Sequence, residues 1–389
     1  MTRVLELSAQ AAGGVRAHIR QVSQLLAKDG HQVLLAGPSN VIFPAPDAVS
    51  GACLRTYQID IGARPSGADL KALRQLKQLA ATVEVIHAHG LRAGALAVLA
   101  AKRLPAAKRP RVVVTLHNLP VGSAPTRLVG KALHLVVVKG ADYVLTVSPD
   151  LLEKAKQLGL EAGEIAVVPA PARGCVDCSC MDHAAQPEIS QASAQSSDTG
   201  SGVDSGSGYG ASSDTDCDAA PCLLTIARLA PQKGLDLLLE AATLIKQRGI
   251  NFTWLVAGDG PLKAQLNQQI TAADLPVKLL GRREDIGALL AQADVVVQTS
   301  YWEGQPLTLR EAMQAGRAIV ATDVGGSAYT LAGCGQLVEP QAGPLADAVV
   351  AIISDPKRRE TLEAASRAAV AKIPGETQLR EQLDRVLAL

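Results

Sequence analysis

Aromatic residues are scarce in this chain: Phe, Trp and Tyr together make up only 2% of its 389 residues. Proteins that bind single-stranded nucleic acid stack the bases on aromatic side chains, so the scarcity argues against that class of function. Hydrophobic residues nevertheless reach 48% of the chain, as in a packed globular protein. We therefore expect cores built from Leu, Val, Ala and Ile.

Long uncharged apolar runs are also missing. None reaches the roughly 18 residues that a membrane-spanning helix needs, and Met1 to Ser8 lead into a strand-like run rather than an export signal. Seven cysteines are an odd number in a chain without such a signal, which favours reduced thiols. We therefore expect a cytoplasmic protein.

The net charge of +1 excludes a strong overall charge of either sign, but the basic residues are unevenly placed. Between Arg64 and Lys139, thirteen Lys and Arg residues stand against only two acids, Asp69 and Glu84. Such a surplus favours an anionic acceptor or peripheral contact with the inner face of a membrane. Solvated surface side chains without a partner explain it equally well, so both interpretations stay open.

Residues 173–219 interrupt an otherwise patterned chain. This segment is rich in Ser, Asp, Gly, Ala and Gln, which predicts a disordered insert or linker between two folded parts. Its cluster Cys175, Cys178, Cys180 and His183 is close to metal-ligand spacing, but structural zinc sites usually draw ligands from two separated pairs. We therefore expect no metal.

Strand and helix patterns alternate on both sides of this segment, which predicts two parallel sheets of the α/β class. Before it, residues 41–64 are irregular, and Leu70, Leu73, Leu76 and Leu79 follow one side of a helix. The expected strands are residues 3–8, 31–36, 83–88, 111–116, 165–169, 221–227, 251–257, 277–281, 293–299 and 317–321. The expected helices are residues 15–28, 68–81, 93–102, 124–139, 150–158, 235–247, 286–291 and 307–315, with closing helices over 345–367 and 376–389.

The most informative stretch runs from Thr299 to Gly326. It places Glu303 in a turn with Gly304, Pro306 at the start of a helix, and Glu311 more than a full turn further in. The two carboxylates cannot lie side by side on one helix, so they suit two parts of one extended ligand. The free N–H groups at the helix start suit an anionic group such as a phosphate.

This stretch resembles the retaining glycosyltransferases of the two-Rossmann-domain (GT-B) fold, of the glycogen-synthase-like or family-four type. The resemblance rests on Glu303, seven residues, Glu311, then Ala312-Met313 and Ala315-Gly316, and on Arg228 and Lys233 in an earlier loop. It implies that Glu303 contacts the donor sugar, that Glu311 binds the nucleotide ribose, and that Arg228 and Lys233 neutralise the leaving phosphates. Further donor-binding residues are expected at Gly13, Gly14, Gly258, Arg282, Gly304, Gln305, Pro306 and Leu307.

Histidines end two strands of the first part. His87 and His89 point the same way on one strand, and His117 follows the next. The family has similar strand ends, which implies that His117 contacts the donor sugar in the catalytic cleft; His89 is a possible acceptor-side residue or a structural histidine. Two departures are Ala170 after Pro169, where the family continues Pro-Asn-Gly, and Ala227, where it has glycine.

The resemblance implies an acceptor-side domain over residues 1–172, a donor domain over 220–375, and a helix over 376–389 that crosses back to the first domain. The expected activity is metal-independent, retaining transfer of a sugar from a nucleotide-diphosphate sugar, without a cofactor, to a lipid-linked or small cytosolic acceptor. A nucleotide-sugar epimerase or hydrolase on the same fold, and a non-catalytic nucleotide-sugar-binding protein, are the alternatives.

Overall fold

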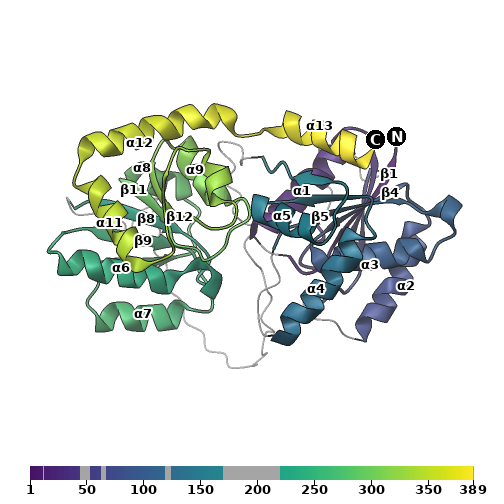
Figure 1. Cartoon of the computed structure of the whole chain (residues 1–389), viewed down its shortest axis with the longest axis horizontal. Helices are drawn as coiled ribbons and strands as arrows, with labels where there is room; N and C mark the ends of the chain where they lie inside the picture. Colours follow the sequence, from purple (N-terminus) through teal and green to yellow (C-terminus); the bar gives the residue numbers. More distant parts are fainter. Residues whose placement is uncertain (12, 44–52, 63–66, 119–123, 170–219, 389) are drawn as a thin grey trace, which may run out of the picture.

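The structure is a computed structural model that describes residues 1–11, 13–43, 53–62, 67–118, 124–169 and 220–388. It contains two parallel sheets flanked by helices, which confirms the expected two-domain α/β fold. The predicted insert, with its cysteine cluster, lies outside the described residues. Figure 1 shows the two sheets in separate halves of the molecule, joined at the top by the α12–α13 connection.

The first sheet has seven parallel strands in the order β3-β2-β1-β4-β5-β6-β7. Its strands are β1 (Arg3–Ser8), β2 (Gln32–Gly37), β3 (Leu54–Gln58), β4 (Val85–His89), β5 (Arg111–Leu116), β6 (Tyr143–Thr146) and β7 (Gly163–Ile165). Its helices are α1 (Gly13–Lys28), α2 (Ala68–Ala80), α3 (Leu91–Lys102), η1 (Ala106–Lys108), α4 (Ala124–Val138) and α5 (Pro149–Gln157).

The second sheet has six parallel strands in the order β10-β9-β8-β11-β12-β13. These are β8 (Cys222–Ile226), β9 (Thr253–Ala257), β10 (Val277–Gly281), β11 (Val295–Gln298), β12 (Ala318–Thr322) and β13 (Gln336–Val338). Its helices are η4 (Pro231–Lys233), α6 (Leu235–Gln247), α7 (Lys263–Ala272), α8 (Ile286–Gln292), α9 (Leu307–Gln314), α10 (Ser327–Leu331), α11 (Ala342–Ile353), α12 (Pro356–Ala369) and η5 (Val370–Lys372), and α13 (Glu376–Leu387) follows.

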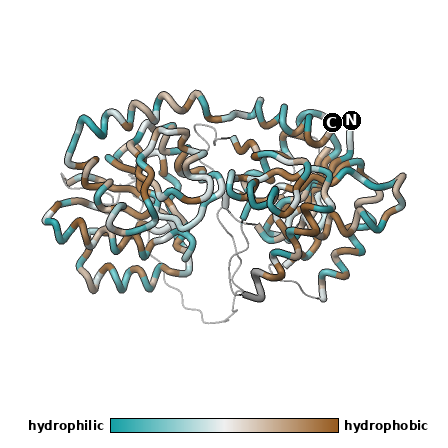
Figure 2. The backbone as a smooth tube through the Cα atoms, viewed as in Figure 1, coloured by the Kyte–Doolittle hydropathy of each residue, from teal (hydrophilic) through white to brown (hydrophobic). Residues whose placement is uncertain are grey.

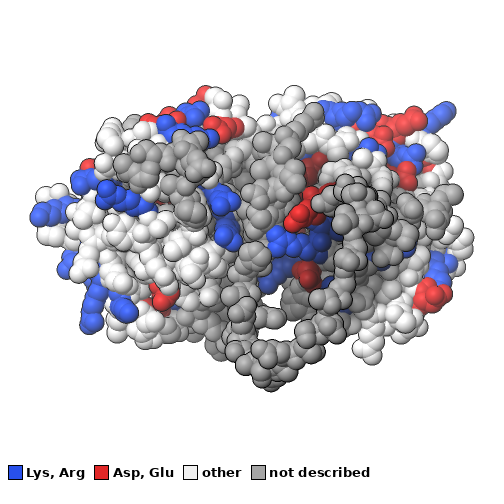
Figure 3. Space-filling model, turned by 180° about the vertical axis from the view of Figure 1, so that it is seen from behind, with Lys and Arg blue, Asp and Glu red and all other residues white. Residues whose placement is uncertain are grey.

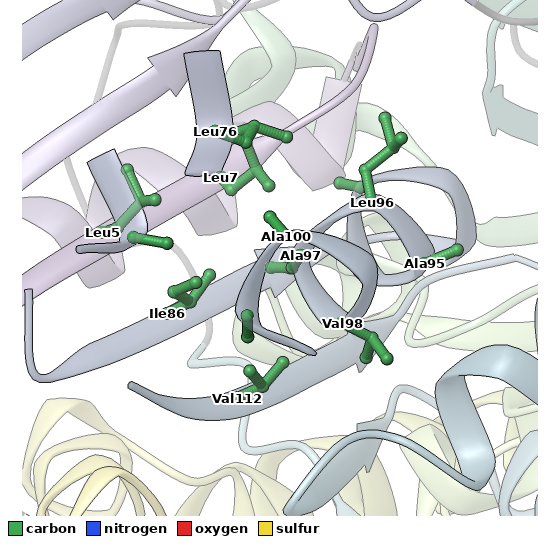
Figure 4. Close-up of a cluster of buried hydrophobic side chains, with 14 of the residues drawn as sticks. Leu5, Leu7, Leu76, Ile86, Ala95, Leu96, Ala97, Val98, Ala100 and Val112 are labelled. Atoms are coloured by element: carbon green, nitrogen blue, oxygen red, sulfur yellow. The ribbon is translucent and has the colours of Figure 1, made fainter. Parts of the chain in front are cut away.

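Aliphatic side chains fill both faces of each sheet. In the first domain, α2 and α3 cover one face through residues such as Leu76 and Ala97, which meet Leu5, Leu7 and Ile86 of the strands (Figure 4). The opposite face carries α1, α5 and α13. Figure 2 shows the same arrangement, with hydrophobic strands inside and hydrophilic outer helix turns. The cores are therefore aliphatic, as the composition predicts.

The last helix crosses back to the first domain, as expected. Helix α12 packs on the second domain, whereas Leu379 and Leu383 of α13 are buried against the first (Figure 1). Gln382 holds the connection in place, because its Oε1 accepts from the Val167 backbone N at 2.7 Å and its Nε2 donates to the Ile165 carbonyl at 2.9 Å. Helix α13 is therefore part of the folded first domain, although it follows the second domain in the sequence.

Several local expectations were wrong for physical reasons. Strand β3 was missed because it is an edge strand in which only Leu54 is buried. In α2 the buried positions are Ala72, Leu73, Leu76 and Ala80, while Leu70 is 63% exposed, because a spacing of three drifts away from a 3.6-residue period. The last strand of the first sheet is Gly163–Ile165 rather than 165–169, since the Val167 backbone N bonds to Gln382 instead of a strand.

Cysteine and membrane expectations have different outcomes. Cys222 is disulfide-bonded, so the expectation of reduced thiols is wrong for this residue, whereas Cys53 and Cys334 are free. Within the described residues, no helix combines the length and the apolar character that crossing a bilayer requires.

Candidate active site

Each sheet has a point where the strand order reverses, and ligands of such sheets bind at the carboxyl ends of the strands there. In the second sheet this point lies between β8 and β11. The loop after β8 carries Arg228 and Lys233, and the loop after β11 carries Glu303. The structure therefore brings these three sequence-predicted residues to one edge of one sheet.

Close backbone packing fixes the Arg228–Lys233 loop. Gly234 has φ +60°, and a Cβ there would lie 2.0 Å from the Thr299 carbonyl oxygen. A Cβ on Gly258, which has φ +146°, would lie 1.9 Å from the Ala227 carbonyl oxygen. Only glycine allows the three loops after β8, β9 and β11 to approach this closely. Gly258, a predicted donor-binding residue, thus supports this loop.

Lys233 and Glu303 meet directly. The Lys233 Nζ donates to Glu303 Oε1 at 2.6 Å, and the Ser300 hydroxyl donates to the same oxygen at 2.6 Å. The side chains are 26% and 9% exposed, so the pair lies at the edge of the protein interior. Arg228 is exposed, and its side chain has no hydrogen-bond or ion-pair partner in the described part of the chain. A fixed cation–carboxylate pair and a free guanidinium together suit a sugar diphosphate.

The Glu303 loop packs against Gly326 of its own domain on one side and faces the first domain on the other. Gly326 N donates to the Glu303 carbonyl at 2.9 Å, and a Cβ on Gly326 would lie 1.8 Å from the Gly304 carbonyl oxygen. On the other side, a Cβ on Gly304 would lie 2.6 Å from Val147 Cγ2 and 3.6 Å from the His117 carbonyl oxygen. The structure thus places His117 across the domain boundary from Glu303, as the sequence predicts.

Helix α9 holds the other predicted donor residues in different settings. Pro306 is the N-cap of the helix rather than its first residue. Leu307 Cδ1 would lie 3.6 Å from a Cβ on Gly14, so Gly14 borders the start of α9, whereas a Cβ on Gly13, which starts α1 with φ +55°, would meet nothing within 4 Å. Gln305 is engaged in protein contacts, because its Nε2 donates to the Ala166 carbonyl at 2.7 Å and its Oε1 accepts from Arg310.

Glu311 is half-buried, and burial raises its pKa to about 7. No cation offsets that burial in the described residues, so the carboxyl group keeps its proton to a higher pH than an exposed glutamate does. A carboxyl group in this state suits neutral hydroxyl partners such as those of a ribose. Arg282 is exposed at the end of β10, two strands away from β8, so the structure does not group it with Lys233 and Glu303.

The first sheet carries a buried polar cluster at its own reversal point, between β1 and β4. Glu6 Oε1 lies 3.1 Å from His87 Nδ1, and Oε2 lies 2.7 Å from His89 Nε2. His89 Nδ1 lies 3.2 Å from His117 Nε2, and the His18 ring packs edge-on against the rings of His89 and His117. We call these five residues the histidine cluster.

Burial and mutual repulsion set the charges in the histidine cluster. Burial alone would raise the pKa of Glu6, but the adjacent His87 and His89 hold it at about 2. Burial, followed by the neighbouring histidines, lowers the pKa of His18 to about 3 and that of His89 to about 4. The pKa of His117 is also well below its usual value, chiefly because of burial. At neutral pH, Glu6 is therefore ionised while these three imidazoles are neutral.

Two members of the histidine cluster, Glu6 and His18, were not predicted. Glu6 had a signal, because a carboxylate in an otherwise apolar buried strand requires a partner. His18 had none, since it occupies an ordinary position on the buried face of α1. Glu6, His87 and His89 are also metal-ligating residue types whose ligand atoms lie within 4.8 Å of one another.

The comparisons with known proteins agree with this architecture. Residues 13–171 match the model of the glycosyl transferase 4-like domain, and residues 220–355 match that of glycosyl transferases group 1. The structure superposes on Anabaena HepE in complex with UDP with a TM-score of 0.70 and 19% identity, each chain being covered completely. That likeness shows the fold.

Two curated relatives match parts of the chain. The alpha-D-kanosaminyltransferase of Streptomyces kanamyceticus is 32% identical over 152 residues, which are 37% of this chain and 39% of that protein. A Campylobacter jejuni N,N'-diacetylbacillosaminyl-diphospho-undecaprenol alpha-1,3-N-acetylgalactosaminyltransferase is 40% identical over 111 residues, 28% of each chain. The matched segments thus span well under half of these relatives. Taken with the two domain models and the paired sheets, they show that the chain belongs to the glycosyltransferases of the two-Rossmann-domain (GT-B) fold.

Proposed function

We propose that the protein transfers a sugar from a nucleotide-diphosphate sugar to an acceptor hydroxyl with retention of anomeric configuration and without a metal ion. The observation that carries this proposal is the Lys233–Glu303 pair at the β8/β11 reversal point, with His117 across the domain boundary. A diphosphate would lie between Arg228 and Lys233, and the sugar would extend along Glu303 toward His117.

In the proposed reaction, the bond between the anomeric carbon and the diphosphate oxygen breaks and its electron pair stays on the diphosphate. Lys233 and Arg228 stabilise this charge, each charge-assisted hydrogen bond contributing about 1.5–3 kcal/mol. The acceptor oxygen forms the new bond to the anomeric carbon, and its proton passes to the departing phosphate oxygen. The two cations take the part that a metal plays in other phosphate-transfer sites.

Retention is proposed to follow from attack on the face that the diphosphate leaves. Retaining glycosidases instead use a carboxylate nucleophile about 5 Å from a second carboxyl group. Glu303 is poorly suited to that role, because its Oε1 already accepts from both Lys233 and Ser300. An acceptor held on the leaving phosphate retains the configuration without a covalent intermediate.

We propose a lipid-linked or small acceptor, used at the cytoplasmic side of a membrane. The name of the Campylobacter relative includes a diphospho-undecaprenol acceptor, and the basic surplus of the first domain is compatible with an anionic surface. On the face of that half that Figure 3 shows, the visible Lys and Arg side chains form separate groups rather than one patch. Such groups support weak, salt-sensitive contact.

The test compares Lys233→Met and Glu303→Gln with the matched variant Lys246→Met. Lys246 forms a surface ion pair with Asp274 at 2.9 Å on the same domain, so its loss has little effect on activity. Removing a group that stabilises transition-state charge lowers turnover by about 10²–10³-fold. We expect that loss in the two site variants, measured as nucleotide release from a panel of sugar donors with lipid-linked and small acceptors.

Two results contradict the proposal. Wild-type turnover in folded Lys233→Met would exclude the cation from the reaction, and donor consumption that continues unchanged without acceptor would favour an epimerase or hydrolase. Metal independence is tested separately: turnover should persist after the protein is treated with a chelator and the chelator is removed.

A further inference from the structure

The histidine cluster contains a continuous line of side chains from a buried carboxylate to the domain boundary. Glu6 lies 2.7 Å from His89, and His89 lies 3.2 Å from His117. Exposure rises along this line, from 0% at Glu6 through 2% at His89 to 7% at His117. The line therefore starts in the interior of the first domain and ends beside the candidate active site.

The charge of Glu6 fixes the proton on His89. An ionised carboxylate has only acceptor oxygens, so the contact at 2.7 Å requires that His89 donate from Nε2. A neutral imidazole carries one proton, and it then lies on Nε2. His89 Nδ1 therefore has a lone pair and can only accept.

The same logic reaches His117. Because His89 Nδ1 accepts, the contact at 3.2 Å requires that His117 donate from Nε2. The neutral His117 ring then has its lone pair on Nδ1. That nitrogen has no hydrogen-bond partner within the described residues, and it is not one of their buried unpaired atoms. The accessible nitrogen at the domain boundary is thus an acceptor.

We propose that Glu6 and His89 are positioning residues that hold His117 in its Nε2–H form, so that Nδ1 accepts a hydrogen bond from a hydroxyl group of the donor sugar. The inference rests on the function proposed above and adds which chemical group of the donor can bind at His117. A hydroxyl group can donate to Nδ1, whereas a carboxylate or phosphate oxygen is repelled by the lone pair. The first domain therefore favours a neutral hydroxyl-bearing group at this place.

His87 and Thr115 buttress the line from the side. His87 Nδ1 lies 3.1 Å from Glu6 Oε1, and His87 Nε2 lies 2.8 Å from the Thr115 hydroxyl. Both oxygens of Glu6 are thereby engaged, and the carboxylate cannot rotate away from His89. Register supports this arrangement, because Glu6 of β1 pairs with His87 of β4.

A metal ion held by Glu6, His87 and His89 would move the ring protons of His89 and His117 to the other nitrogen of each imidazole. His89 would then bind the metal through Nε2 and carry its proton on Nδ1, and His117 Nε2 would accept a hydrogen bond from that N–H group, with its own proton on Nδ1. Burial argues against this occupant, because Glu6 and His87 are 0% exposed and an ion would have to lose its water and displace neighbouring side chains to reach them. The two states predict opposite tautomers for His117.

The experiment is ¹⁵N NMR of the imidazoles in the full chain at pH 7, with the His117 signals identified by their absence in His117→Asn. Long-range couplings to the ring carbon protons distinguish a protonated from an unprotonated nitrogen. We expect His117 to be neutral with its proton on Nε2, before and after the addition of Zn²⁺. A proton on Nδ1, a doubly protonated ring, or signals that move with Zn²⁺ would each overturn the proposal.

The Glu6→Gln variant tests the positioning role. Its amide donates from nitrogen and accepts at oxygen, so His89 can reverse and His117 Nδ1 becomes protonated in part or all of the molecules. We expect this NMR change together with a kcat that is about 10–100-fold lower and unchanged nucleotide affinity. The matched variant Glu84→Gln, which alters an exposed carboxylate paired with Arg3, should leave the His117 NMR signals and kcat unchanged.

If Glu6→Gln does not fold, the wild-type spectrum alone still decides the tautomer. The spectrum needs no substrate, so it separates the two proposals. If the protein shows the expected His117 tautomer but transfers no sugar, the proposed function is wrong and the described hydrogen bonds of the cluster still hold. If it transfers sugar but shows the opposite tautomer, only the positioning role of Glu6 and His89 is wrong.

Discussion

Replacement of Gly326 by Ala tests whether the position of the Glu303 loop sets the rate of sugar transfer. Gly326 has φ −94° and ψ 11°, a conformation that alanine can adopt, so backbone strain does not complicate the change. The new Cβ would lie 1.8 Å from the Gly304 carbonyl oxygen and 2.9 Å from its carbon. Cβ atoms essentially never approach other heavy atoms within 3.0 Å, so Gly304 must move by more than 1 Å.

That movement carries the neighbouring Glu303 away from its position. A misplacement of about 1 Å in an active site can lower the rate by about 10²-fold. Stability should fall by about 1–3 kcal/mol, as is usual for overpacking, including any weakening of the 2.9 Å bond from Gly326 N to the Glu303 carbonyl. The expected result is thus a large loss of turnover in a protein that remains folded.

The assay measures kcat with the sugar donor that the panel identifies, and the free energy of unfolding in urea. Gly343→Ala is the matched control, because a Cβ there meets nothing within 4 Å and the residue lies in the first helical turn of α11. It should keep wild-type turnover and gain up to about 1 kcal/mol of stability. Wild-type kcat in Gly326→Ala would refute the reasoning, since the loop would then be free to move without consequence.

Two further predictions concern stability. Burial raises the pKa of Glu311 from 4.5 to about 7, so between these values the folded chain keeps a proton that the unfolded chain has released, and stability falls as the pH rises. Glu311→Gln should remove this decline. Urea unfolding of both proteins from pH 4.5 to 8 measures it, and an equal dependence of the unfolding free energy on pH in the two proteins would disprove the prediction. Gln382→Leu should cost about 2–3 kcal/mol, because Val167 N and the Ile165 carbonyl lose their partners. Urea unfolding checks this, with the exposed-site variant Glu381→Leu as the control. Equal unfolding free energies for Gln382→Leu and Glu381→Leu would contradict the prediction.

The fold followed from the sequence because buried parallel strands and amphipathic helices leave strong periodic signals. The predicted bounds of β5, α6 and β10 agree with the structure at every residue. Strand β3 left no such signal, because an exposed edge strand need not be apolar. The split between α11 and α12 was also missed, although Asp355 and Pro356 mark it: the Asp355 side chain accepts from Lys357 N and Arg358 N.

The candidate site was only partly accessible from the sequence. Residues near one another in the chain, such as Glu303 and Glu311, carried a recognisable spacing. The Lys233–Glu303 contact joins residues 70 positions apart, and the Glu6–His89 contact joins residues 83 positions apart. Such contacts depend on strand order, which no local pattern contains. The roles assigned to the site residues remain predictions until the variants are measured.

The loop that carries Glu303 also bonds to the first domain on both sides of that residue. On one side of Glu303, Trp302 Nε1 donates to Asp150 at 2.9 Å; on the other, Gln305 Nε2 donates to the Ala166 carbonyl at 2.7 Å. If the domains part, Lys233 and Glu303 leave together while His117 stays behind. Under the proposed function, Lys233, Glu303 and His117 can act together only while the two domains are in contact, so separation of the domains would also end the reaction.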